Sequence, residues 1–199
     1  MRAFLLALVF LGCNGAAPPP DASSTPEGLS PRAMTTDSTR TLFDFDSGEG
    51  APWRIVNDGV MGGKSQGFSE IRDGALRFTG TLVTDGGGFT STRVDQRMDL
   101  SGYAAIELRV RGGGRSFELD VDDGTLRGFR PVSRRGAFPT SGDWQIVRVE
   151  FADLQTSVFG QPVRAEPLAP EAVRSLSLFI ADGQDGPFEL EVDWIRAAP

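Results

Sequence analysis

The residues with which this chain could do chemistry are carboxylates, a single lysine and a single tyrosine. Its 199 residues include no histidine, which excludes histidine general bases, Ser-His-Asp triads and almost every catalytic zinc site. Asp120 and Asp122 stand two positions apart, so that a strand would present both on one face. Glycosidase chemistry instead needs carboxylates on both sides of a substrate, about 5 to 9 Å apart. The pair therefore predicts a solvated sheet face, and the chain is predicted not to be an enzyme.

A third carboxylate, Asp58, lies in the most distinctive segment of the sequence. Residues 53–68 read WRIVNDGVMGGKSQGF, a long glycine-rich connection with two apolar residues in its middle. Loops of this kind often carry function, and glycine lets the backbone approach a partner closely. We predict a binding loop that consists of Asn57, Asp58, Val60, Met61, Gly62, Gly63, Lys64 and Ser65. The alternative is that Asn57 and Asp58 accept hydrogen bonds from backbone N–H groups and only hold the loop in shape.

The elements that must hold this loop are predicted to be strands. Apolar and polar residues alternate in runs such as 106–110, 117–121 and 176–180, and turn-forming pairs such as Asp73-Gly74 separate the runs. One-sided alternation is typical of antiparallel sheets with one buried face. The pattern predicts an all-β sandwich or jelly roll of about ten short antiparallel strands, with at most one short helix near residues 171–175.

The segment NDGVMGGKS, residues 57–65, is similar to the signature of the complex I intermediate-associated protein 30 family. The resemblance covers nearly all of residues 41–197. The agreeing segments downstream of the signature are 74–80, 87–91, 99–103 and 106–112. It implies a galactose-binding-like jelly roll and a non-enzymatic role, since the mitochondrial member is a chaperone-like assembly factor for respiratory complex I. It also implies that Gly88, Phe89 and Ser91 belong to the binding surface.

Two kinds of partner remain open for this predicted binding module. The first is a protein, held through the glycine-rich loops, which an apolar patch around Val60 and Met61 would favour. The alternative is a saccharide of the cell envelope, which an exposed tryptophan in a concave groove would favour. The aromatic residues that could stack on a sugar are Trp53, Trp144, Phe89 and Phe129. A nucleic-acid partner is not expected, because the net charge is −7.

Acidic residues at the two ends of the domain suggest a structural ion. The domain begins with LFDFD and ends with EVDW, and jelly rolls of the sugar-binding type often bring the first and last strands together. Calcium binds six to eight oxygen atoms, which Asp46 and Asp193 could contribute to from the two ends. We expect a structural calcium there and no other cofactor; the alternative is a solvated acidic rim.

The first forty residues are predicted to be an export segment and a tether. Residues 1–12 have a basic start and an apolar run of the length of a signal peptide, too short to span a bilayer. The stretch FLGC resembles a bacterial lipobox, so Cys13, the only cysteine, is the expected lipidation site. Residues 13–40 are rich in Pro, Ser, Thr and Ala and predict a flexible tether to a domain at 41–199. The expected location is the bacterial cell envelope, lipid-anchored at the outer membrane and facing the periplasm; a plain secretory signal is the alternative.

Overall fold

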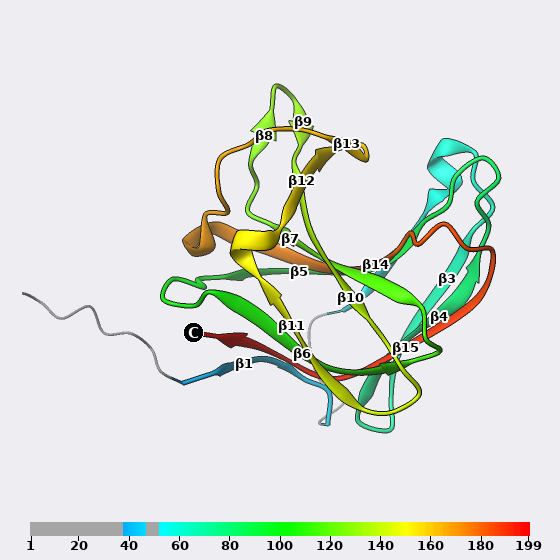
Figure 1. Ribbon diagram of the computed structural model, residues 1–199, viewed down its shortest axis with the longest axis horizontal. Helices are drawn as coiled ribbons and strands as arrows, with labels where there is room; N and C mark the ends of the chain where they lie inside the picture. The colour runs from blue at the N-terminus through cyan, green and yellow to red at the C-terminus, as the bar shows by residue number, and fades with distance from the viewer. Residues whose placement is uncertain (1–37, 47–51) are drawn as a thin grey trace, which may run out of the picture. The chain divides into compact units, whose positions relative to one another are not determined.

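The computed structural model describes residues 38–46 and 52–199, which form two large β-sheets and one separate hairpin (Figure 1). The six-stranded sheet contains β1 (Arg40–Asp44), β3 (Gln66–Arg72), β4 (Ala75–Leu82), β6 (Ala105–Gly112), β11 (Gln145–Glu150) and β15 (Gly186–Ala198). The seven-stranded sheet contains β2 (Arg54–Asn57), β5 (Thr90–Met98), β7 (Ser116–Asp122), β10 (Ser133–Pro139), β12 (Gln155–Val158), β13 (Gln161–Pro162) and β14 (Val173–Ile180). The separate hairpin pairs β8 (Leu126–Arg127) with β9 (Arg130–Pro131).

Strand pairing in the described residues is antiparallel throughout, and most spatial neighbours are distant in sequence. The six-stranded sheet has the order β11-β6-β15-β4-β3, and β1 pairs with the second half of β15, beyond the part that pairs with β4. The seven-stranded sheet has the order β13-β12-β10-β7-β14-β5-β2. The first and last strands thus lie side by side, and the chain passes repeatedly from one sheet to the other.

The apolar residues of the alternating runs fill the space between the two sheets. Leu119 of β7 and Leu178 of β14 face each other in register and are fully buried, as is Phe78 of β4 in the opposite sheet. Phe78 also packs edge-to-face on Phe188, with 4.9 Å between ring centroids. One core shared by both sheets stabilises the domain because each strand removes one apolar face from water. The predicted all-β sandwich is confirmed.

The structure adds short elements that the sequence pattern does not reveal. Strands β8, β9 and β13 have two residues each, too few for an alternation to be visible. Helical structure is limited, in the described residues, to three 3-10 turns: η1 (Asp58–Met61), η2 (Phe151–Asp153) and η3 (Pro170–Ala172). The helical turn expected at 171–175 ends at Ala172, because Val173 begins β14 and its side chain is buried in the core.

The predictions for the N-terminal segment fall almost entirely on residues that the structure does not describe. These are the signal peptide at 1–12, the lipidation of Cys13 and most of the tether at 13–40. Within the residues that are described, no helix has both the length and the apolar character needed to cross a membrane.

Candidate functional site

The predicted binding loop begins where β2 ends and lies against the glycine-rich loop that precedes β5. The carboxylate of Asp58 is fully buried between the two loops. It accepts hydrogen bonds from Ser65 Oγ at 2.7 Å and from the Ser65 backbone N–H at 3.1 Å. On the other side it accepts the N–H groups of Gly88 at 2.7 Å and Phe89 at 3.3 Å. One side chain therefore joins two segments that lie about thirty residues apart.

The surroundings of Asp58 favour its charged form. Burial alone would raise its pKa, but hydrogen bonds from Gly88, Ser65 and Phe89 outweigh burial and hold the pKa of Asp58 below its usual value. The carboxylate is therefore an anion at neutral pH, and four donors already occupy it. This arrangement suits a buried hydrogen-bond acceptor that fixes two loops, and leaves Asp58 poorly suited to take a proton from a substrate.

Two glycines of these loops make room for the Asp58 carboxyl group. A Cβ atom added to Gly63 or to Gly87 would overlap it. Gly88 has a φ of 118°, a backbone conformation that L residues rarely adopt, and it directs its N–H towards the same carboxylate. Close packing inside the protein thus explains the glycines at 63 and 87, and backbone conformation explains the glycine at 88.

The remaining residues of the predicted loop also contact other parts of the chain. Asn57 Oδ1 accepts hydrogen bonds from Thr90 Oγ1 at 2.6 Å and from the N–H of Gly67 at 3.0 Å. Lys64 is exposed and pairs with Asp85 of the facing loop at 2.9 Å. Asn57 thus links the end of β2 to β3 and β5, while Lys64 adds a contact between the two loops at the surface.

The other members of the predicted surface are placed less favourably for binding. Gly62 ends η1 with a φ of 86°, and Ser91 is fully buried, with its Oγ 3.4 Å from the carbonyl of Val56. The side chains of Val60 and Met61 lie outside the described part of the structure, so the apolar patch predicted around them stays a prediction.

The loop that precedes β5 lines a groove, with Phe89 in its wall. The groove has a volume of about 350 Å³ and lies at the outer face of the seven-stranded sheet, the face turned away from the core. Its lining consists of Gly87, Gly88, Phe89, Pro131, Ser133, Arg135, Phe159, Gly160 and Ala181. The Arg135 guanidinium stacks on Phe179, 3.7 Å from the ring centroid, and this ring lies 6.1 Å from that of Phe89.

The motif at 87–91 predicts Gly88 and Phe89 as binding residues, but it does not indicate Arg135, Phe159 or the other residues that line this groove. Arg135 comes from β10 and Phe159 from the turn between β12 and β13, and neither belongs to a motif. Phe159 has a φ of 50°, which is uncommon for a non-glycine residue. This feature becomes visible only in the structure, because dihedral angles cannot be read from the sequence. The groove is assembled by the sheet order β12-β10-β7-β14-β5, which brings residues from distant parts of the sequence together.

Asp120 lies next to Arg135 on the same outer face. The two residues face each other in register between β7 and β10. Asp120 is nonetheless buried, which contradicts the solvated face predicted for it. Burial raises the pKa of Asp120 to about 6, although the charge of Arg135 and the N–H of Arg134, at 2.9 Å, favour its ionised form. The sequence could not show this because strands on both sides of β7 enclose the carboxyl group.

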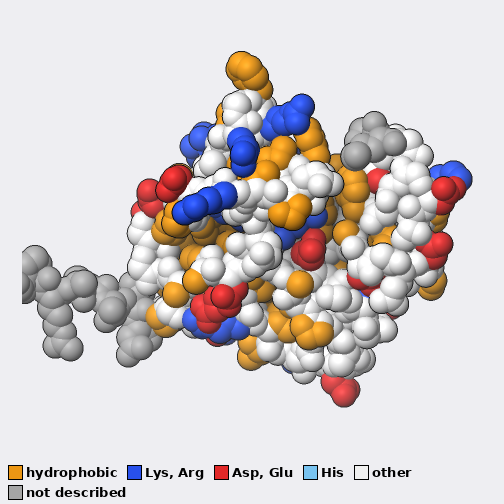
Figure 2. Space-filling view, turned by 45° about the horizontal axis from the view of Figure 1, so that its top comes forward, with side chains coloured by type: hydrophobic (Ala, Val, Ile, Leu, Met, Phe, Trp, Pro, Cys, Tyr) orange, Lys and Arg blue, Asp and Glu red, His pale blue; other side chains and the backbone are white. Residues whose placement is uncertain are grey.

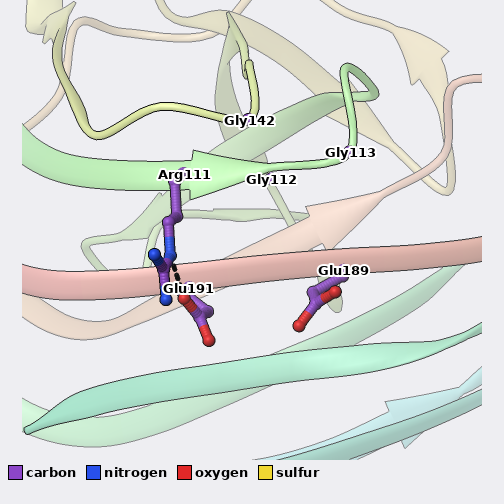
Figure 3. Close-up of a pocket in the computed structure, with 6 residues that line it drawn as sticks. All are labelled: Arg111, Gly112, Gly113, Gly142, Glu189 and Glu191. Atoms are coloured by element: carbon purple, nitrogen blue, oxygen red, sulfur yellow. Dashed lines mark hydrogen bonds and ion pairs between the residues drawn. The ribbon is translucent and has the colours of Figure 1, made fainter.

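A second hollow lies on the outer face of the six-stranded sheet, where β6 and β15 run side by side (Figure 3). It has a volume of about 290 Å³, and glycines at the ends of its strands leave it open. Figure 3 shows Arg111 and Glu191 turned towards each other, and these two side chains form an ion pair. Arg77 pairs with Glu189 at 2.8 Å and with Glu191 at 3.2 Å. The charges of this hollow therefore neutralise one another, and the groove at Phe89 is the better candidate site.

Of the two carboxylates proposed as calcium ligands, Asp193 already forms an ion pair with Arg109 at 2.5 Å. The contact of Asp46 is made by its backbone, whose N–H donates to Asp44 Oδ1 at 3.1 Å. Within residues 38–46 and 52–199 there is no cluster of three or more Asp, Glu, Cys or His residues able to hold a metal ion. The calcium site stays a prediction that these contacts do not support.

The aromatic residues proposed as sugar platforms are scattered. Trp53 packs edge-on against Phe43, with 5.4 Å between ring centroids, and it borders the core. Trp144 lies beneath the guanidinium groups of Arg109 and Arg111, each 4.8 Å from its ring, on the side of the six-stranded sheet. Phe129 is fully exposed at the turn of the β8–β9 hairpin. Of the four, only Phe89 lines the groove.

The two-sheet jelly roll is the class of fold to which solved structures also point. The protein resembles the family 11 carbohydrate-binding module of a cellulosomal cellulase from Clostridium thermocellum, with a TM-score of 0.61 and 14% sequence identity over 81% of this chain and 95% of that one. The same module in complex with a mixed-linked tetrasaccharide gives a TM-score of 0.61 at 16% identity over 80% and 95%. At these identities the likeness establishes the jelly-roll fold.

The family is established by sequence. The model of the Complex I intermediate-associated protein 30 family matches residues 43–192, and the chain belongs to this family. A curated relative, the mitochondrial Complex I intermediate-associated protein 30 of Mus musculus, is 26% identical over an alignment of 200 positions. The alignment covers 85% of this chain and 59% of that protein. The match thus spans about three fifths of the relative's length. The resemblance carried by residues 57–65 is confirmed.

This comparison corrects the predicted location. The apolar start and the lipobox-like stretch predicted a lipid-anchored protein of the bacterial outer membrane, whereas the named relative is mitochondrial. The prediction is therefore wrong. A short apolar run followed by a cysteine shows local hydrophobicity, but it does not specify the membrane or the compartment.

Replacing Asp58 tests its role as the link between the two loops. Asp58→Asn keeps the size of the side chain but turns an N–H₂ group towards backbone donors, so we expect a loss of about 1 to 3 kcal/mol in unfolding free energy. Amide exchange of Gly88 and Phe89 should also accelerate. Urea unfolding and hydrogen exchange measure the two effects. Asp85→Asn, on an exposed carboxylate of the facing loop, is the control and should change stability by less than about 0.5 kcal/mol; equal effects of both variants would refute the assignment.

Asp120 predicts an unusual pH dependence. Its folded pKa of about 6 exceeds the unfolded value, so its contribution to stability is fully present below about pH 4 and is lost as the pH rises through 6. Asp120→Asn removes this loss, and should stabilise the protein by about 2 to 3 kcal/mol at pH 7.5 but hardly at pH 4. Unfolding measured at both pH values checks this. A variant that is destabilised at pH 7.5, or one that behaves like Asp95→Asn on the exposed part of the same face, would contradict it.

Proposed function

We propose that the protein is a non-enzymatic binding module that holds a segment of a partner protein in the groove at Phe89. The proposal rests on the groove, which is lined by Phe89, Phe159 and Arg135. The Arg135 guanidinium is held in place by stacking on Phe179. Aromatic and arginine side chains are the residue types that contribute most to protein–protein binding energy. The volume of about 350 Å³ suits a few side chains of an extended segment.

The rigidity of the loops supports the same function. The buried Asp58 fixes Gly88 and Phe89 before any partner arrives, so that little conformational entropy is lost when the groove is filled. The signature residues then act by positioning Phe89, and not by contacting the partner. Membership of a family named for its association with complex I intermediates supports an assembly-factor role, in which the partner is a subunit or factor of a growing complex.

A saccharide is the second candidate ligand. Its support is the polar character of the outer sheet face, where Arg93 Nε donates to Ser177 Oγ at 3.0 Å and Asp120 lies buried nearby. Hydroxyl, carboxyl and guanidinium groups in a recess are the groups that recognise sugars. Against it stands the position of Trp53 and Trp144, neither of which lines this groove.

The groove can be tested with two variants and one matched control. Photo-crosslinking from position 133, at the groove wall, should join the full chain to specific proteins in a mitochondrial extract. We expect Phe89→Ser and Arg135→Gln to reduce these crosslinks about tenfold or more, because each removes a wall of the groove. Phe68→Ser, on an exposed phenylalanine of β3, should leave them unchanged.

A glycan array with the same proteins separates the two candidates. Glycan binding by the unchanged protein that Phe89→Ser abolishes would replace the protein partner by a saccharide. Crosslinks that persist in both groove variants, together with an array without signal, would show that this groove is not the binding site.

A further inference from the structure

The hairpin β8–β9 and the neighbouring β12–β13 turn form an exposed surface, which meets the groove at Pro131, Phe159 and Gly160. Figure 1 shows β8 and β9 projecting at one end of the domain, beside β12 and β13. Three large apolar side chains are exposed there: Leu126 by 58%, Phe129 by 100% and Phe159 by 71%. We call this surface the hairpin tip. Exposed apolar side chains that gather in one place mark interaction sites more often than scattered ones do.

The turn of the hairpin is built to present Phe129. Arg127 pairs with Arg130, which leaves Gly128 and Phe129 as the two turn residues. Gly128 has a φ of 67°, the left-handed conformation that two-residue hairpin turns favour at their first position. Phe129 consequently occupies the apex, where the domain provides no surface for its ring to pack against.

Arginines surround the apolar side chains of the hairpin tip. Arg127 Nη1 contacts the carbonyl of Arg164 at 3.4 Å, and the Arg130 guanidinium lies 5.4 Å from the centroid of the Phe159 ring. In the described residues, none of Arg127, Arg130 and Arg164 forms a salt bridge with a carboxylate. Figure 2 shows basic and hydrophobic side chains together at this end of the domain. The chain as a whole carries a net charge of −7, so the tip is a local basic region on an acidic protein.

The charge and shape of the hairpin tip favour a lipid surface as its partner. A projecting aromatic ring can insert into the boundary between lipid headgroups and acyl chains, because this boundary is deformable. Arginines beside the ring can bind anionic headgroups while their aliphatic parts stay in the apolar layer. An acidic protein would otherwise be repelled from an anionic membrane, so binding there requires a basic region of this kind.

We propose that the hairpin tip docks the domain reversibly on an anionic lipid surface, with Phe129 inserted at the interface and Arg127 and Arg130 at the headgroups. This surface is separate from the groove at Phe89, although Phe159 borders both. Docking would hold the outer face of the seven-stranded sheet close to a membrane and leave Phe89 and Arg135 accessible to a membrane-bound partner. It does not depend on which ligand fills the groove.

Vesicle binding by the full chain tests the docking surface. The protein should bind vesicles of equal parts phosphatidylcholine and phosphatidylglycerol more tightly than vesicles of phosphatidylcholine alone, and high salt should weaken binding. Phe129→Ala should lower the partition coefficient roughly tenfold. Arg127→Gln with Arg130→Gln should lower it about 25-fold, from a factor of about five for each arginine. Phe68→Ala, equally large but on the opposite sheet, is the matched control.

A fluorescent probe at the apex reads insertion directly, even if another part of the chain also binds the vesicles. Phe129→Trp should shift its emission to shorter wavelength on anionic vesicles and be quenched by brominated lipid, whereas Phe68→Trp should show neither change. Equal loss of binding in the Phe129→Ala and Phe68→Ala variants, or an apex tryptophan that brominated lipid does not quench, would overturn the proposal.

Discussion

The buried carboxylate of Asp58 is the interaction on which the loop end of the sandwich depends. The contacts that join the two glycine-rich loops are polar. A single anion accepts four hydrogen bonds, and the donors come from both loops. A buried charge is stable only when such donors replace the water that it has lost. The glycines at 63 and 87 are consequences of this constraint, because a side chain at either position would displace the carboxylate.

The same constraint gives two residues of the family signature a role inside the protein. Asp58 and Asn57 face inwards, and what they control is the position of Phe89 and of the strand that follows it. Phe89 in turn lies beside Phe179, on which Arg135 stacks. The buried network therefore positions one wall of the groove, because Asp58 holds Gly88 and Phe89, which line it.

The two outer sheet faces differ in what they offer a ligand. On the six-stranded sheet, arginines and carboxylates alternate across strands and neutralise one another, as Arg77 does with Glu189 and Glu191. The seven-stranded sheet has a buried carboxyl group in Asp120 and an apolar groove at its end. On the first face the charges form a network of ion pairs, whereas on the second Phe89, Phe159 and Arg135 line a groove. This difference is the reason why the proposed binding site lies on the seven-stranded sheet.

The features that could be predicted from the sequence are local in origin. The period-two alternation identified the strands and the side chains that meet in the core, because a strand exposes alternate residues to opposite faces whatever it pairs with. The motif at 57–65 identified the family, and the missing histidines removed whole classes of catalysis. Which strands are neighbours depends on the tertiary fold. The order β12-β10-β7-β14-β5-β2, which is not the order of the chain, brings Asp58 to Gly88, Arg135 to Phe179 and Phe159 to the groove. Burial, and with it the raised pKa of Asp120, follows from that order, because the strands that enclose a carboxyl group come from distant parts of the sequence.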